Sequence, residues 1–216
     1  MTQRIHHPAR LLSRFGRDER GTTMVELAIV LPFLLLLILA LVDFGRMGGE
    51  YVMTNKAVQW ASRLAVVRPP ACNGVPTFNA RGPVAGGTIP PKFGTACSAG
   101  SNICINPGTI SCTASTANPT VQEIWTAISP MMPNNATPAN LRFSYAFDPA
   151  LGFLGGPYVP VVTVEVQNLN FNFVTPLGGF STLYGTVNPQ VPPNSLPFPA
   201  ISTSLPGEDL DLGTNG

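Results

Sequence analysis

The stretch that decides the fold is Gly21–Val42, which reads GTTMVELAIVLPFLLLLILALV. It places a single glutamate, Glu26, five residues after Gly21, at the start of an otherwise uncharged apolar run. The 21 residues from Thr22 to Val42 would span roughly 31 Å as an α-helix, close to the hydrocarbon thickness of a bilayer. Pro32 lies inside the run, but membrane helices tolerate proline. We therefore predict a transmembrane helix over residues 22–42.

The charges on the two sides of this run differ in sign. Residues 1–20 contain five arginines and two acidic residues, a balance of +3, whereas residues 22–216 contain seven basic and nine acidic residues, a balance of −2. Because positive flanks stay in the cytoplasm, we expect a single-pass protein of the bacterial inner membrane with a cytoplasmic amino terminus and a periplasmic carboxyl-terminal domain.

The overall length and composition limit the size and the function of the part outside the membrane helix. The chain has 216 residues, a net charge of +1 and only 11% charged residues. This length fits one membrane helix and one modest globular domain. The absence of a basic surface argues against nucleic-acid binding.

The four cysteines all lie on the predicted outer side. They form an even set, and their spacings are too wide and irregular for a zinc site, so we expect two disulfides in an oxidising compartment. Three pairings are possible, and the sequence does not choose among them. The four are Cys72, Cys97, Cys104 and Cys112.

An amphipathic pattern follows the apolar run, and it predicts that the helix extends over residues 43–68. Arg68-Pro69-Pro70 would end the helix, while Gly45, Gly48 and Gly49 weaken it and suggest a hinge just outside the membrane. The apolar stripe of this extension would pack either on the chain's own outer domain or on neighbouring subunits. Its members are Phe44, Met47, Tyr51, Val58, Ala61 and Ala65.

The sequence of the outer portion predicts a small sheet with a helix packed against it. Residues 69–119 hold eight prolines and seven glycines and are expected to form a long disulfide-pinned loop. We predict a short helix at Thr120–Met131, with Trp125 as a core anchor, and then strands over 141–147 and 159–173. Near Asn168 the alternation changes phase, which suggests a bulge or a bend.

Beyond these strands, residues 186–199 contain five prolines and would be extended, residues 201–205 could add an edge strand, and residues 206–216 form an acidic tail. Residues 120–205 would thus make one α+β periplasmic domain. The predicted fold class is α+β: a long amino-terminal transmembrane and amphipathic helix, then a small, mainly antiparallel sheet domain with one short helix and the disulfide-pinned loop.

The outer portion offers little for catalysis. Both histidines, His6 and His7, precede the membrane run, so Ser-His-Asp and Cys-His arrangements and mixed-ligand zinc sites are not available outside. The carboxylates Glu123, Asp148 and Glu165 are far apart in sequence, and the glycine-rich stretches lack the order of a phosphate-binding loop. We predict no enzyme, no metal site and no cofactor.

Glu26 is the strongest functional candidate. A carboxylate this close to hydrocarbon costs about 2–3 kcal/mol unless it reaches water or finds a partner. If the chain is cut after Gly21, the new amine on Thr22 becomes a cation one helical turn away, within the subunit or on its neighbour. Such pairing would set the register of packed helices. The alternative is an ordinary signal anchor with Glu26 among the lipid headgroups.

Two stretches resemble a known family. Arg17-Asp-Glu-Arg-Gly-Thr-Thr-Met-Val-Glu-Leu-Ala28 and Asp43-Phe-Gly-Arg46, with the leucine-rich run between them, are similar to the TadE/TadG-like pseudopilins of the tight-adherence (Flp) pilus system. The closing portion, with Val162-Thr-Val-Glu-Val166, also resembles the last strands of such proteins.

The resemblance implies processing by a prepilin peptidase after Gly21, with Glu26 as the fifth mature residue, and a minor-pilin role in a filament used for adherence and biofilm growth. The implied partners are this peptidase, other Flp/Tad pilins, pilus-assembly membrane proteins and membrane lipid. Lipid or neighbouring subunits would be contacted by Leu27, Pro32, Phe33, Phe44, Met47 and Tyr51. The alternative function is an uncleaved bitopic inner-membrane protein whose periplasmic domain binds a partner or a polysaccharide.

Overall fold

The structure is a computed structural model that describes residues 22–84, 86–87, 89–175, 178–179, 195–208 and 210. The predicted leader, most of the extended segment over 186–199 and the end of the acidic tail lie outside the described residues.

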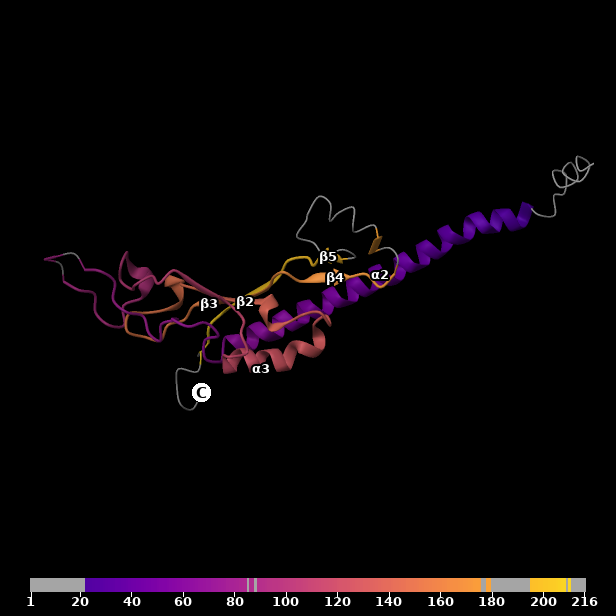
Figure 1. Ribbon diagram of the computed structural model, residues 1–216. Coiled ribbons are helices and arrows are strands. Elements are labelled where there is room, and N and C mark those ends of the chain that lie inside the picture. The colour runs from indigo at the N-terminus through magenta and orange to yellow at the C-terminus, as the bar shows by residue number, and fades with distance from the viewer. Residues whose placement is uncertain are drawn as a thin grey trace, which may run out of the picture.

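One long helix, α2 (Thr22–Ala65), runs through the apolar stretch and its amphipathic extension (Figure 1). It has 44 residues and ends three residues before Arg68. Gly45, Gly48 and Gly49 do not interrupt it, so the hinge predicted there is not a break in the helix. Each glycine costs about 1 kcal/mol relative to alanine, and tertiary packing of the turns that follow can outweigh this cost.

The outer domain is built on a four-stranded antiparallel sheet with the strand order β1-β2-β3-β6. Burial alternates along the two central strands, which shows that the sheet covers a core with one face only. As predicted, the last strand of the chain pairs at an edge of this sheet. The strands are β1 (Thr109–Thr113), β2 (Leu141–Ala146), β3 (Val161–Val166) and β6 (Ile201–Pro206).

The core lies between this sheet and the carboxyl-terminal half of α2. Both β3 and β6 contact α2, and α3 (Pro119–Ile128) packs against it as well. From α2 the core receives mostly small side chains, Ala57, Val58, Ala61 and Ala65, which bring the helix close to the larger residues of the strands. The largest buried side chains of the four-stranded sheet are Phe143 and Tyr145.

The short helix α3 lies close to its predicted position, Thr120–Met131. Asn118 caps α3 by accepting hydrogen bonds from the backbone N–H groups of Thr120 and Val121. The last predicted turn is a separate 3-10 turn, Ser129–Met131, because Pro130 cannot continue the α-helical hydrogen bonding.

A second, two-stranded sheet continues from the first. Asn168 has a φ of 53°, in the left-handed region that asparagine tolerates, and this turn separates β3 from β4 (Asn170–Asn172). The predicted change of phase therefore corresponds to a real break in the strand. β4 pairs with β5 (Ser195–Pro197), and both lie beside α2 (Figure 1).

Strand β1 departs from the prediction, because it lies inside the stretch 69–119 that was expected to be a loop throughout. Its five residues pair with β2 along their whole length, and Cys112 lies opposite Phe143. The strand contains two threonines, a serine and a cysteine, and Ile110 is its one large aliphatic residue. An edge strand with an exposed face needs few large side chains, which is why the sequence pattern did not reveal it.

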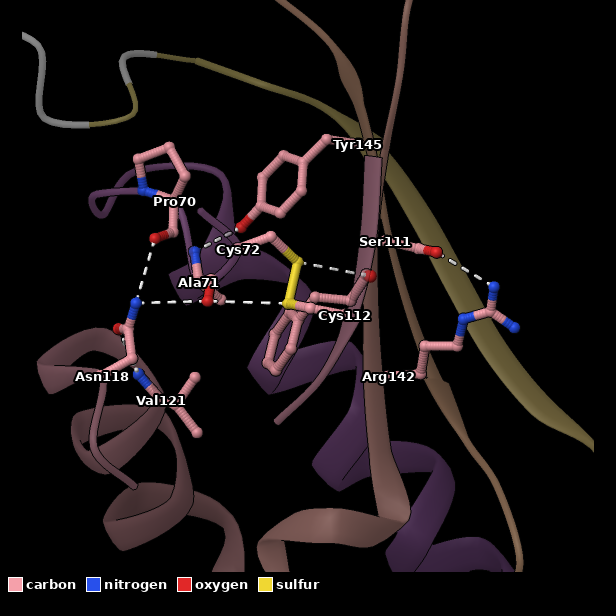
Figure 2. Close-up of a disulfide and its surroundings, with 10 residues drawn as sticks. Pro70, Ala71, Cys72, Ser111, Cys112, Asn118, Val121, Arg142 and Tyr145 are labelled. Carbon is pink, nitrogen blue, oxygen red and sulfur yellow. Dashed lines mark hydrogen bonds between the residues drawn. A yellow bond between two sulfur atoms is a disulfide. The ribbon is translucent and has the colours of Figure 1, made fainter. Parts of the chain in front are cut away.

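The two disulfides are Cys72–Cys112 and Cys97–Cys104. The first ties the chain just beyond α2 to β1 (Figure 2). Around it, the Tyr145 hydroxyl accepts a hydrogen bond from the Ala71 backbone N–H at 2.8 Å, and the Asn118 side chain donates to the Pro70 and Ala71 carbonyls. The end of α2, the sheet and α3 are thus joined at one point.

The second disulfide belongs to what we call the distal lobe, the described residues among 73–108 together with residues 147–158. Its small core consists of Cys97, Cys104 and Leu154. The lobe lies at the end of the molecule opposite the amino-terminal half of α2 (Figure 1).

Candidate functional site

The amino-terminal half of α2 is uncovered. In its most apolar stretch of 18 residues the mean hydropathy is 3.0, and none of this stretch is buried within the chain. Large side chains such as Phe33, which is 72% exposed, have no cover from the described part of the chain. Leaving so much apolar surface in water is unfavourable, so lipid or other helices must cover it. The helix fits a single-pass membrane protein.

Glu26 lies near the beginning of this bare helix. It is exposed and has no ion pair among the described residues. Thr22 is the first described residue of α2, four positions earlier, so the two residues share one face of the helix. Gly21 lies outside the described residues, and cleavage after it stays a prediction.

The residues predicted to contact lipid or neighbouring subunits differ in their surroundings. Leu27, Pro32, Phe33 and Phe44 are exposed, whereas Met47 is half-buried. The ring of Tyr51 lies 6.3 Å from that of Phe198 and remains partly exposed. The amphipathic stripe is therefore covered by the chain's own domain from Val58 to Ala65, while Phe44 is left open.

Where the apolar run ends, the structure places a buried carboxylate, Asp43, with an accessibility of 0%. It accepts hydrogen bonds from the backbone N–H groups of Val174 and Thr175, at 3.3 and 3.2 Å, and from the Thr175 hydroxyl. This contact, which we call the Asp43 clamp, joins α2 to a segment 131 residues further along the chain. It fixes the outer domain at the boundary of the predicted membrane span.

Arg46 extends the clamp by one turn. Its guanidinium lies 3.6 Å from Asp43 and 3.1 Å from Glu50, and 5.6 Å from the centre of the Phe171 ring on β4. Burial raises the pKa of Asp43, but the hydrogen bonds from Thr175 and Val174 and the Arg46 charge lower it, and the balance leaves the pKa below its ordinary value. Asp43 is therefore held as a carboxylate.

A depression of about 430 Å³ lies beside the Cys72–Cys112 disulfide. It is lined by small and polar residues, including Asn73, Thr113, Ser115 and Asn118, and no acidic, basic or histidine side chain of the described residues lines it. The described residues also contain no group of three or more histidine, cysteine or acidic side chains that could hold a metal ion. The depression thus brings no pair of groups together for acid–base chemistry.

The Asp43 clamp was missed by reasoning from the sequence, in which Asp43 featured only as part of a family motif. One signal was available, because a lone carboxylate directly after an uncharged apolar run needs either water or a partner. Its partner could not be found that way, since two of the three donors are backbone N–H groups on a distant segment.

One comparison with known proteins gives a match, and it lies on the long helix. Residues 21–63 match the family model described as TadE-like protein, which covers about a fifth of the chain and includes Gly21, Glu26 and Asp43. This match confirms the resemblance to TadE-like pilins over that segment. No curated protein and no solved structure matches the chain.

Proposed function

We propose that this chain is a minor pilin, or pseudopilin, that acts in the assembly of a tight-adherence pilus after a prepilin peptidase removes residues 1–21. The observation that supports this proposal most is that the TadE-like match, residues 21–63, contains both the uncovered apolar half of α2 and Glu26. A TadE-like protein is associated with the Tad pilus, and its role is structural rather than catalytic. Its partners are other components of that pilus.

In this proposal, cleavage creates an amine on Thr22, and the amine and Glu26 neutralise each other within one helix or between neighbours. Opposite charges in a low-dielectric surrounding attract strongly, so the pair would fix how far one helix slides along another. The exposed surface from Leu27 to Val42 would supply the side-by-side contact first with lipid and then with other pilins.

The orientation follows the charge difference across the helix, with residues 1–20 in the cytoplasm and the outer domain in the periplasm. The outer domain would remain attached to the filament or to its base. Adherence and biofilm growth would then depend on this chain through the filament that it helps to build.

The first test is the mature amino terminus, measured by mass spectrometry of the full chain extracted from membranes of cells that have the peptidase. We expect a chain that begins at Thr22, and the uncut chain in cells without the enzyme. An intact chain in both would contradict the proposal and favour an uncleaved bitopic protein with an outer binding domain.

The second test separates the charge of Glu26 from its size. Glu26→Gln keeps the shape of the side chain and removes the charge, whereas Glu26→Asp keeps the charge. We expect Glu26→Gln to remain in the membrane fraction but to reduce piliation strongly, and Glu26→Asp to retain more of it. Equal piliation in Glu26→Gln and the parent chain would remove the role of the charge.

A further inference from the structure

The distal lobe exposes an unusual amount of apolar surface. Ile89 is 92% exposed, Phe93 74% and Phe78 58%, and Phe153, Ile105 and Val84 are exposed as well. Apart from these six and the residues of α2, Val174 is the only exposed large hydrophobic residue in the described part of the chain. Apolar surface gathered at one end of a domain marks a contact site more often than chance exposure does.

The rings of Phe93 and Phe153 lie against one turn of this lobe, Gly155-Gly156-Pro157, and the backbone of Phe78 pairs with the same turn. A Cβ atom on Gly155 would lie 2.5 Å from the Phe93 ring, and one on Gly156 would lie 2.5 Å from the Phe153 ring, so both rings rest directly on glycine backbone. Phe78 pairs with Pro157 through a β-bridge. We call Phe78, Phe93 and Phe153 the aromatic patch.

The backbone under the patch is held firmly. The Asn79 N–H donates to the Gly156 carbonyl at 2.8 Å and the Gly155 N–H to the Asn79 carbonyl at 2.9 Å, while Gly94 and Leu154 are joined by a 2.9 Å bond. The Cys97–Cys104 disulfide closes the same lobe. The rings are therefore preorganised, which reduces the entropy lost when a partner binds.

The charged side chains in the first segment of the lobe are all basic. Residues 69–119 contain two cations, Arg81 and Lys92, and no acidic residue. The Arg81 guanidinium lies 5.0 Å from the centre of the Phe93 ring and has no carboxylate partner in the described part of the chain, while its Nε atom is buried there without an acceptor. Asp148, the acid in the other segment of the lobe, accepts from its own Ala150 N–H.

We propose that the aromatic patch, with Arg81 and Lys92, is a docking surface for a protein partner that presents a carboxylate beside apolar side chains. Aromatic rings and arginine are enriched at protein interfaces, and an arginine stacked on a ring forms charge-assisted hydrogen bonds with a carboxylate. The Arg81 and Lys92 charges favour an occupant with a carboxylate, and the position of the lobe opposite the apolar helix directs it away from the membrane that holds that helix (Figure 1).

The test uses the full chain in its own cells, with the photoreactive residue p-benzoylphenylalanine placed at Phe93 and, as a control, at Trp60. Trp60 is an exposed aromatic residue on α2, outside the lobe, with an exposed fraction of 50% against 74% for Phe93. After irradiation, we expect the Phe93 probe to give an adduct with a different protein, and fragment spectra to locate the attachment next to an aspartate or glutamate. The Trp60 probe should not give this adduct.

The charge is tested with Lys92→Glu and Arg81→Gln in the Phe93-probe chain. Lys92 is exposed, so its replacement leaves the lobe packing intact. Both variants should reduce the adduct at least about fivefold, because like charges at an interface repel and a lost charge pair is not replaced. Thiol alkylation without reduction checks that both disulfides remain closed, and an amino terminus at Thr22 shows that processing is unaffected.

Several results would overturn the proposal: no adduct at Phe93, an adduct of twice the mass of this chain, an adduct with lipid or polysaccharide, or a protein adduct whose yield does not change in either charge variant. None of these results bears on cleavage after Gly21. The docking proposal and the proposed pilin function therefore fail separately.

Discussion

The two halves of α2 are one continuous helix but have opposite surroundings. From Met24 to Val42 the helix carries bulky aliphatic side chains, and nearly all of them are exposed. From Thr54 to Ala65 the inward positions are small, and Ala57, Ala61 and Ala65 are fully buried under the sheet. One continuous helix can therefore have an exposed apolar half and a half that packs in a protein core. The size and burial of its side chains change along the helix, while the backbone remains helical.

This contrast predicts that substitutions in the two halves have separate effects. Substitutions in the outer half should change the free energy of unfolding of the outer domain, and those in the apolar half should change membrane insertion or helix association instead. Both tryptophans, Trp60 and Trp125, lie outside the predicted span. Tryptophan fluorescence during urea unfolding in detergent micelles therefore reports on the outer domain alone.

The largest effect should come from removing the Cys72–Cys112 disulfide, which closes a stretch of 40 residues at the end of α2. The Cys72→Ala/Cys112→Ala variant should lose about 4 kcal/mol of unfolding free energy, since the unfolded chain gains loop entropy. The Cys97→Ala/Cys104→Ala variant, with a separation of 7 residues, should lose about 2.5 kcal/mol. Both should still resist extraction from membranes by alkaline carbonate. Equal losses, or release from the membrane, would contradict this expectation.

The next largest effect should come from overpacking the core between α2 and the sheet. Ala61→Leu inserts a large side chain between α2 and the sheet, where Ala61 has no exposed surface, and should cost about 3 kcal/mol. Its counterpart is Leu36→Ala in the bare half, which should leave the urea midpoint unchanged because no other part of the described chain covers Leu36. If Leu36→Ala also lowered the midpoint, the two halves would be coupled.

The boundary itself is tested at Asp43. Asp43→Ala leaves the N–H groups of Val174 and Thr175 without their acceptor and should cost about 2 kcal/mol. Asp43→Asn keeps an acceptor oxygen but removes the charge that faces Arg46, so it should cost less. Hydrogen exchange of the Val174 and Thr175 amides should rise in Asp43→Ala and stay nearer the parent rate in Asp43→Asn. Unchanged exchange in both variants would show that the clamp does not hold this segment.

The smallest expected effect is a loss of folding stability at alkaline pH, and it concerns only the outer domain. Burial raises the pKa of Tyr145 above 10.0, although the Ala71 N–H that donates to its hydroxyl lowers it, and burial also raises the pKa of Tyr158. Because the folded state disfavours the phenolates, stability should be constant below about pH 10 and fall as the pH rises further through the folded pKa values. Urea midpoints between pH 8 and 11 measure this slope, and Tyr145→Phe should flatten it. An unchanged slope would assign the alkaline loss to other groups.

Much of this fold follows from patterns that are local in the sequence. The long helix, the short helix after Asn118, the alternation in β2 and β3 and the phase change at Asn168 are all set by residues within one or two turns of each other. Of the candidate site, the apolar run and Glu26 could be found in the same way.

The remaining features depend on residues that are far apart in the chain. The pairing of Cys72 with Cys112 and of Cys97 with Cys104 depends on how the loop folds, and all three pairings fitted the spacing. Strand β1 can be recognised as a strand only from its pairing with β2. The hydrogen-bond donors to Asp43 are mainly backbone groups. Neither residue type nor spacing carries such information.

The continuity of α2 also sets a rotational phase between the membrane and the outer domain. Each residue turns an α-helix by about 100° and advances it by about 1.5 Å. A single residue inserted between Asp43 and Val58 would therefore swing the sheet-bearing face by more than a quarter turn relative to Glu26, whereas seven inserted residues would nearly restore it. The number of residues between the two ends of α2 thus determines the direction in which the outer domain faces relative to Glu26.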